Sequence, residues 1–141
     1  MPELPDVEVF RQYMDSTSLH QKIADVSLKD KSLLGEASSR DLQVRLKDRK
    51  FQSTLRHGKY LFAETDEEDW LVLHFGMTGF LKYFKNDEQA PEHIRMLITF
   101  NNGYHLAYDC QRKLGLIDLT KDTEKFLEEK IRHIEHLNKK R

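Results

Sequence analysis

Apolar residues recur with helical spacing at the start of the chain. Val7, Phe10 and Met14 lie three or four positions apart, so they would share one face of a helix. Pro5 stands just before them, and proline suits the first turn of a helix because the amide hydrogen it lacks is not needed there. The pattern predicts an amphipathic helix over about residues 5–15.

Through the middle of the chain the apolar residues occur in short alternating runs, which are typical of β-strands. The runs that we predict as strands cover residues 22–29, 51–55, 60–63, 70–74, 80–84, 95–100, 104–108 and 116–119. The Asn-Asn-Gly sequence at residues 101–103 predicts a hairpin turn, and residues 38–41 can cap a short helix that carries Leu42 and Leu46. The fold predicted from this order is α+β and mainly β: a two-layer antiparallel β-sandwich with flanking N-terminal and C-terminal helices.

After Thr120 the spacing becomes helical again, and Asp122 or Thr123 is the expected cap. The apolar stripe of this helix consists of Phe126, Leu127, Ile131, Ile134 and Leu137. We therefore divide the chain into a β-sandwich domain over residues 1–120 and a charged helix over residues 121–141. This helix either packs one stripe on the sandwich or begins a linker to a further part.

Composition narrows the class of protein. The 141 residues suit one domain, charged residues make up 33%, and mean hydropathy is −0.71. No apolar run approaches the roughly 20 residues of a membrane span, and the first residues lack the pattern of a signal peptide. A single cysteine, Cys110, can form neither an internal disulfide nor a multi-cysteine zinc site. We expect an intracellular protein without a membrane segment.

The net charge of −1 and the pI of about 6.7 do not by themselves suggest a nucleic-acid binder, because such domains usually carry a basic excess. The charges are unevenly distributed, however. Acidic residues gather at 65–69 and 86–88, and basic residues at 47–50, 56–59, 112–113 and 139–141. One face could therefore bind phosphates while the rest of the surface does not.

The first residues can form a nucleophile. Removal of Met1 would leave Pro2 as a secondary amine, and an α-amino group with a pKa near ~7.7–8.0 has an appreciable neutral fraction at physiological pH. Such an amine attacks an aldehyde-like carbon and gives an iminium ion, while Glu3 could donate a proton and Asp6 would be stabilised by the start of the helix. In the alternative interpretation, Pro2 and Pro5 only stiffen the chain. If Met1 is retained, the nitrogen of Pro2 is an amide and carries no reactive lone pair.

Four stretches, in this order along the chain, resemble the N-terminal catalytic domain of the formamidopyrimidine-DNA glycosylase / endonuclease VIII family. Residues 2–8 read Pro-Glu-Leu-Pro-Asp-Val-Glu, residues 56–61 read Arg-His-Gly-Lys-Tyr-Leu, and residues 74–79 read His-Phe-Gly-Met-Thr-Gly. The fourth stretch runs from His93 through the Asn-Gly turn to Gly115. The resemblance covers about residues 2–120.

The resemblance implies a catalytic group made of Pro2 as nucleophile with Glu3, Asp6 and Lys59, the last of which would aid protonation and phosphate contact. Without the resemblance, Lys59 would be interpreted as a solvated surface lysine. The proposed base-excision-repair function is that of a DNA N-glycosylase with AP lyase activity on damaged double-stranded DNA. It needs no metal or other cofactor in this domain.

The resemblance also implies a DNA-binding group. Met77 would wedge into the base stack, unless it packs in the core, and His74 is expected to be a structural hydrogen-bonding histidine at the same loop. His93 and Arg112 would contact phosphates. Arg112 and Leu114 would join Met77 in filling the space left by the extruded nucleotide and in probing the opposite base.

Four positions depart from the family pattern. Asp6 is one methylene shorter than the family glutamate, Cys110 replaces an acid, Lys113 replaces a second arginine, and Leu114 replaces a phenylalanine. Leucine can still wedge but stacks less well than an aromatic ring. The preference for the base opposite the lesion is therefore the property that we expect to differ most from that of the family.

We also expect the chain to lack two DNA-gripping parts of the family, the helix-two-turn-helix module and the zinc finger. Two alternatives to the enzyme hypothesis follow. The chain could be a catalytically weak or inactive relative that binds DNA or a partner, or it could be a half-enzyme whose missing module comes from a separate protein.

Overall fold

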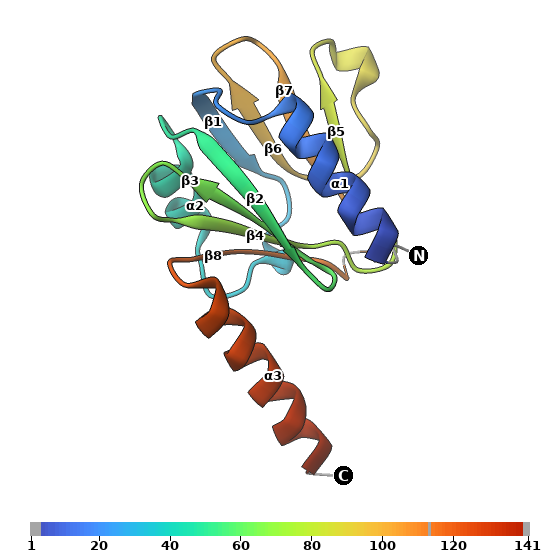
Figure 1. The fold of residues 1–141 in the computed structure, drawn as a ribbon. Helices are drawn as coiled ribbons and strands as arrows, with labels where there is room; N and C mark the ends of the chain where they lie inside the picture. The colour runs from blue at the N-terminus through green and yellow to red at the C-terminus, as the bar shows by residue number, and fades with distance from the viewer. Residues whose placement is uncertain (1–3, 113, 140–141) are drawn as a thin grey trace.

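The computed structural model describes residues 4–112 and 114–139, with side chains described for residues 7–112 and 114–133. The elements in chain order are α1 (Leu4–Thr17), β1 (Ile23–Leu28), η1 (Lys31–Leu33), α2 (Ser39–Leu46), β2 (Phe51–His57), β3 (Tyr60–Thr65), β4 (Trp70–His74), β5 (Phe80–Phe84), η2 (Asp87–Gln89), β6 (Ile94–Phe100), β7 (His105–Asp109), β8 (Leu116–Thr120) and α3 (Thr123–Lys139). Figure 1 shows their arrangement.

The strands form two four-stranded sheets, ordered β1-β6-β7-β5 and β2-β3-β4-β8. All strand pairs within them are antiparallel. The two sheets face each other as layers (Figure 1), so the predicted two-layer antiparallel β-sandwich with helices at both ends is confirmed. None of the described helices is long and apolar enough to cross a membrane.

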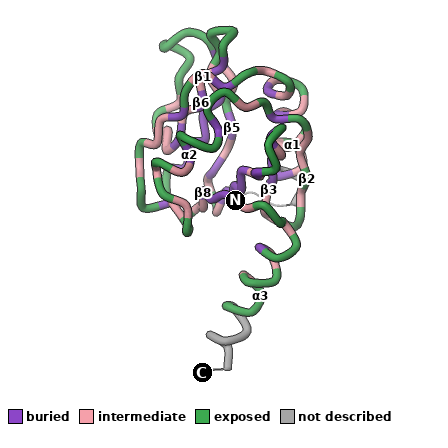
Figure 2. Tube along the Cα trace, turned by 90° about the vertical axis from the view of Figure 1, so that its left-hand side faces the viewer, coloured by how far each residue is buried: buried purple, intermediate pink, exposed green. Residues whose placement is uncertain are grey.

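The main core fills the space between the two sheets. The first sheet contributes buried residues that include Ile23, Val26, Ile98 and Leu106, and the second contributes Leu61, Leu71, Leu73 and Ile117. α1 packs against β2 of one sheet and β5 of the other. It buries Val7 and Met14 completely, and Phe10 packs partly buried against the same core, as its helical spacing predicts. Figure 2 shows these buried stretches gathered within the sandwich.

Two local predictions are confirmed. Ser38 caps α2 in a reciprocal arrangement with Asp41: the hydroxyl of Ser38 accepts from the amide of Asp41 at 3.0 Å, and the carboxylate of Asp41 accepts from the amide of Ser38 at 2.9 Å. The turn between β6 and β7 closes with Gly103 at φ 88°, a backbone conformation that glycine adopts without strain.

A second, smaller apolar cluster lies on the outer side of the β2-β3-β4-β8 sheet. Phe62 and Val72 of the sheet and Phe126 of α3 are its buried members, and Leu127 packs against them. Further along α3, Ile131 is 52% exposed, and the helix runs away from the sandwich (Figures 1 and 2). The packed stripe predicted for this helix is thus present in its first turns, while Ile134 and Leu137 lie outside the described side chains.

Candidate functional site

The loop between β4 and β5 presents a methionine to solvent. It spans residues 75–79 and begins with Phe75, which is buried between the rings of Phe10 and Tyr108 at centroid distances of 4.8 and 5.6 Å. Gly76 has φ 60°, and the amide of Gly79 donates to the carbonyl of Phe75 at 2.8 Å. The tight turn leaves Met77 41% exposed, so the core-packing alternative for this side chain does not hold.

A second loop follows β7, is described at residues 110–112 and 114–115, and presents two more candidate side chains. Arg112 is exposed and Leu114 is 58% exposed, whereas Cys110 at the start of the loop is fully buried. Gly115 ends the loop, and any Cβ placed there would overlap the hydroxyl of Tyr108. The loop therefore passes directly over the core at this point.

These two loops, which we call the loop pair, are locked together. A Cβ on Gly76 would lie 2.9 Å from the carbonyl carbon and oxygen of Leu114, so glycine is needed for the contact. The amide of Arg112 donates to the hydroxyl of Thr78 at 3.3 Å. Met77, Arg112 and Leu114 thus project from two backbones in direct contact.

Tyr108 ties the loop pair to the end of β4. Its hydroxyl donates to the carbonyl of His74 at 2.5 Å, and burial, followed by the neighbouring Cys110 thiol, raises the pKa of the phenol far above its usual value. The phenol therefore stays protonated and remains a donor at any physiological pH.

His74 supports the same loop through its ring. Its Nδ1 accepts from the amide of Gly76 at 3.1 Å, which requires an unprotonated Nδ1, and its ring lies edge-on against Tyr60 at 4.8 Å. Burial, and secondarily the positive charge of Lys59, lowers the pKa of His74. The neutral form that the hydrogen bond needs is therefore the favoured one.

Lys59 is positioned by the turn between β2 and β3. Gly58 has φ 58°, which allows the tight turn, and the following Tyr60 pairs with His74 of β4. Lys59 is half-buried beside this pair, so its charge acts on His74. The catalytic candidate Lys59 and the base of the Met77 loop are therefore neighbours.

A charge network joins α1 to β2. Glu8 accepts from Nε of Arg11 at 2.9 Å and from Nε of Arg56 at 3.2 Å. Arg11 also pairs with Asp15 at 3.0 Å, and the carboxylate of Asp15 accepts from the hydroxyl of Thr54. The hydrogen bonds from Arg11 lower the pKa of Glu8 to about 2. We call these five residues the charge network.

The charge network also extends to the turn that carries Lys59. Nη1 of Arg56 donates to the carbonyl of Gly58 at 3.2 Å. One arginine therefore contacts both the first turns of α1 and the turn before Lys59. Pro2 and Glu3 lie outside the described residues, and nothing is described of the side chain of Asp6, so their place relative to Lys59 stays a prediction.

His93 lies at the base of the second loop. Its amide donates to the buried carboxylate of Asp109 at 2.7 Å, and its carbonyl accepts from the amide of Cys110 at 3.1 Å. The imidazole is 40% exposed and lines a shallow hollow of about 340 Å³ together with Thr78 and Gln111. His93 is thus close to the loop pair, with its ring open to solvent.

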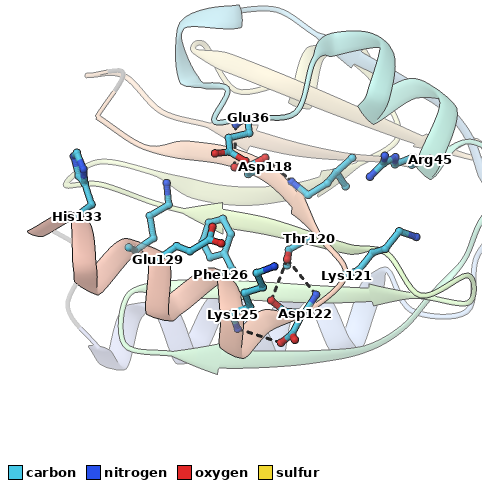
Figure 3. Close-up of a pocket in the computed structure, with 12 residues that line it drawn as sticks. Glu36, Arg45, Asp118, Thr120, Lys121, Asp122, Lys125, Phe126, Glu129 and His133 are labelled. Carbon is cyan, nitrogen blue, oxygen red and sulfur yellow. Dashed lines mark hydrogen bonds between the residues drawn. The ribbon is translucent and has the colours of Figure 1, made fainter.

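A larger hollow of about 840 Å³ lies elsewhere, between α3 and β8 (Figure 3). Its carboxylates stabilise the fold: Asp118 accepts from the amides of Glu36 and Ala37 at 3.2 and 3.0 Å, and Asp122 accepts from the amide of Lys125 at the start of α3. None of the candidate residues with described side chains lines it. Within the described residues, no group of three or more His, Cys, Asp or Glu side chains is placed to hold a metal ion.

Comparison with known proteins now identifies the fold family. The sequence profile of the formamidopyrimidine-DNA glycosylase N-terminal domain matches residues 1–117. The chain belongs to this family. Formamidopyrimidine-DNA glycosylases of Pelobacter propionicus and Streptomyces coelicolor are each 33% identical to it, over 123 and 139 residues, which is 87% and 95% of this chain.

Solved structures of the same family have a fold similar to that of this chain. The wild-type Lactococcus lactis Fpg protein in complex with DNA containing N7-benzyl-Fapy-dG matches with a TM-score of 0.82 at 26% identity, and the match covers 93% of this chain and 48% of that one. The complex of Lactococcus lactis Fpg with DNA containing an abasic site gives a TM-score of 0.81 at 25% identity, covering 93% and 47%. The chain spans about half the length of the curated formamidopyrimidine-DNA glycosylases that it matches, 45% and 49% for the two above.

Sequence reasoning missed several residues that hold this glycosylase-family domain together at the candidate site. Tyr108 and Thr78 connect the loop pair, and Arg56 connects α1 to the Lys59 turn. The helical spacing of Glu8, Arg11 and Asp15 would have signalled an ion-paired helix face. The contacts of Tyr108 and Thr78 span 34 residues each, and no local pattern announces them.

Proposed function

We propose that this domain acts on damaged or abasic double-stranded DNA, as a DNA glycosylase with AP lyase activity that uses Pro2 as its nucleophile. Family membership supports a glycosylase domain. The observation that carries the proposal is the loop pair, which exposes Met77, Leu114 and Arg112 from interlocked backbones beside the Lys59 turn. Two apolar side chains and one cation on such loops suit the gap left by an extruded nucleotide.

The proposed reaction begins with a free N-terminal amine. The lone pair of the Pro2 nitrogen forms a bond to C1′ of the sugar, and the damaged base leaves with the electrons of the glycosidic bond and a proton. Glu3 protonates the ring oxygen as the C1′–O4′ bond opens, which gives an iminium ion. In this scheme Asp6 and Lys59 assist the proton transfers.

Strand cleavage follows from the iminium ion. The positive nitrogen makes the proton on C2′ more acidic. When a base removes this proton, the electron pair of the C2′–H bond forms a C2′–C3′ double bond and expels the phosphate from C3′, which is a β-elimination. Water then hydrolyses the iminium ion and restores the Pro2 amine. His93 and Arg112 are assigned to phosphates, and His74 holds the Met77 loop through its bond to Gly76.

Borohydride trapping tests the proposal. Protein whose intact mass shows removal of Met1 is incubated at high concentration with an oligonucleotide that contains an abasic site, and borohydride reduces the iminium to a stable covalent adduct. We expect an adduct with the free Pro2 protein and none when one glycine is added before Pro2, because the nitrogen then becomes an amide.

The matched control separates chemistry from binding. Both proteins should bind the same DNA containing a tetrahydrofuran abasic analogue, since that contact does not need the amine. An adduct that persists in the glycine-extended protein and that peptide mass locates on a lysine would assign the nucleophile to that lysine rather than to the N-terminus. No adduct with verified free Pro2, despite DNA binding, would leave the domain as a DNA-binding relative without lyase chemistry.

A further inference from the structure

Arg95 stands at an irregularity of β6. Ile94 pairs with Asp109 and Met96 pairs with Tyr108, so β6 has one residue more than β7 between these pairs. That residue is Arg95, in a β-bulge. Bulges turn a side chain out of the regular alternation of a strand and occur often beside functional sites.

The bulge aims the guanidinium of Arg95 at the second loop of the loop pair. Its Nε donates to the carbonyl of Cys110 at 2.7 Å, and its Nη2 donates to the carbonyl of Gln111 at 3.1 Å. These are the two carbonyls that directly precede Arg112. Two charge-assisted bonds from one planar group fix both the position and the direction of this backbone.

The Arg95 side chain is itself held in place. It is 16% exposed, and its Nη1 lies 3.7 Å from the carboxylate of Asp30, which is 14% exposed. The other oxygen of Asp30 accepts from the amide and hydroxyl of Ser32 at 2.9 and 2.7 Å. The carbonyl of Arg95 accepts from the amide of Lys29 at 2.7 Å. Backbone and side chain are both anchored, so the fork toward the loop is pre-organised.

We propose that Arg95 is a positioning residue that sets where Arg112 and Leu114 enter a DNA duplex. It holds the start of their loop from the sandwich side, while Thr78 holds the amide of Arg112 from the neighbouring loop. The DNA-reading part of this inference rests on the proposed function. The positioning of the loop by Arg95 does not depend on the proposed function.

Arg95→Lys tests the loop positioning without DNA. Lysine keeps the charge facing Asp30 but lacks the planar fork that bonds two carbonyls. We expect the hydrogen-bonded amides of Cys110 and Arg112 to exchange with solvent about tenfold faster, while amides in the middle of β6 and β7 are unchanged. Arg49→Lys, which replaces an arginine 3.3 Å from Glu67 outside the loop pair, is the matched control and should leave the loop amides unchanged. Equal exchange in Arg95→Lys and wild type would overturn the positioning role.

DNA binding tests the consequence for reading the duplex. Wild type, Arg95→Lys and Arg49→Lys are titrated with duplexes that carry a tetrahydrofuran abasic analogue opposite each of the four bases, and with the single strand. Arg95→Lys should bind the duplexes about tenfold more weakly and lose preference among the opposite bases, with single-strand binding unchanged. Wild-type duplex affinity and base preference in this variant would overturn the inference.

Trapping on a single-stranded abasic oligonucleotide keeps this inference apart from the proposed function. Arg95→Lys should form as much adduct there as wild type, because no opposite base is present. Should wild type with free Pro2 form no adduct, the lyase chemistry fails, and the exchange and binding measurements still decide the role of Arg95. Arg95→Gln is the second variant: its side chain is shorter and neutral and has one donor nitrogen in place of three, so it should raise amide exchange and weaken duplex binding more than Arg95→Lys does.

Discussion

The loop pair and the charge network position neighbouring parts of the candidate site by different physical means. The loop pair depends on close backbone contacts at glycines, on the hydrogen bond that Tyr108 donates and the one that Thr78 accepts, and on the two bonds from the largely buried Arg95. The charge network depends on carboxylate–guanidinium pairs whose side chains are 27–35% exposed. Salt and acid act on exposed ion pairs far more than on buried hydrogen bonds. The backbone that carries Met77, Arg112 and Leu114 is therefore held mainly by contacts that salt and acid change little, whereas α1 is held by contacts that respond to both.

The largest expected effect comes from filling the glycine contact inside the loop pair. Gly76 and Gly58 have nearly the same φ, 60° and 58°, but a Cβ at Gly76 meets the Leu114 carbonyl whereas one at Gly58 meets nothing within 4 Å. Gly58→Ala should cost about 1–2 kcal/mol from backbone strain alone. Gly76→Ala should cost about 1–3 kcal/mol more, because the loops must separate. Urea unfolding of the two variants measures the difference, and equal losses would show that the loop contact is loose.

A smaller loss is expected from Tyr108→Phe. The change removes the 2.5 Å hydrogen bond to the carbonyl of His74 and keeps the buried ring. A hydrogen bond of this kind contributes about 1–2 kcal/mol. Tyr104→Phe, at a 36% exposed tyrosine, is the matched control and should be nearly neutral in the same thermal unfolding experiment. A neutral result for Tyr108→Phe would mean that the loop pair does not need its link to β4.

The pH dependence of the loop pair should come from His74. Because burial and Lys59 lower its pKa in the folded protein, protonation favours the unfolded chain. The stabilising contribution is fully present above the ordinary histidine pKa of 6.5 and is lost as pH falls below it toward the lower folded value. Unfolding free energies measured between pH 7.5 and 5 should show this loss in wild type. The His74→Gln variant, whose side chain does not titrate, should lose less unfolding free energy over the same pH range. Identical pH profiles for the two proteins would contradict the proposal that the His74 ring causes this loss.

The smallest effect is expected in the charge network. Glu8→Gln removes a carboxylate whose pKa is lowered to about 2 by its hydrogen bonds with Arg11. The advantage of wild type is fully present above pH 4.5 and disappears as pH falls toward 2. It should also shrink in high salt, which screens exposed pairs. Parallel thermal melts of the two proteins across these conditions provide the test, and a salt-independent difference would mean that Glu8 acts by packing.

The fold could be predicted from the sequence because its main elements follow local rules. Val7, Phe10 and Met14 mark the buried face of α1, and the Asn-Asn-Gly turn marks the β6–β7 hairpin. The two 3₁₀ turns, η1 and η2, were not predicted, because three-residue elements leave no periodicity to detect.

The candidate site was predictable only in part. Motifs indicated which loops would carry Met77 and Leu114, and both side chains are exposed. The devices that hold them could not be predicted, since the bulge at Arg95 depends on the register between β6 and β7. The contact of Gly76 with Leu114 likewise depends on how two distant loops meet in space.

The tight contact between Gly76 and Leu114 has a consequence for any exchange of these loops with those of a relative. Residues 75–79 and the described residues 110–112 and 114–115 are in direct contact, so exchanging one loop alone for that of a relative would leave a misfit. A graft designed to change the proposed opposite-base preference should transfer both segments together with Tyr108, the side chain beneath them.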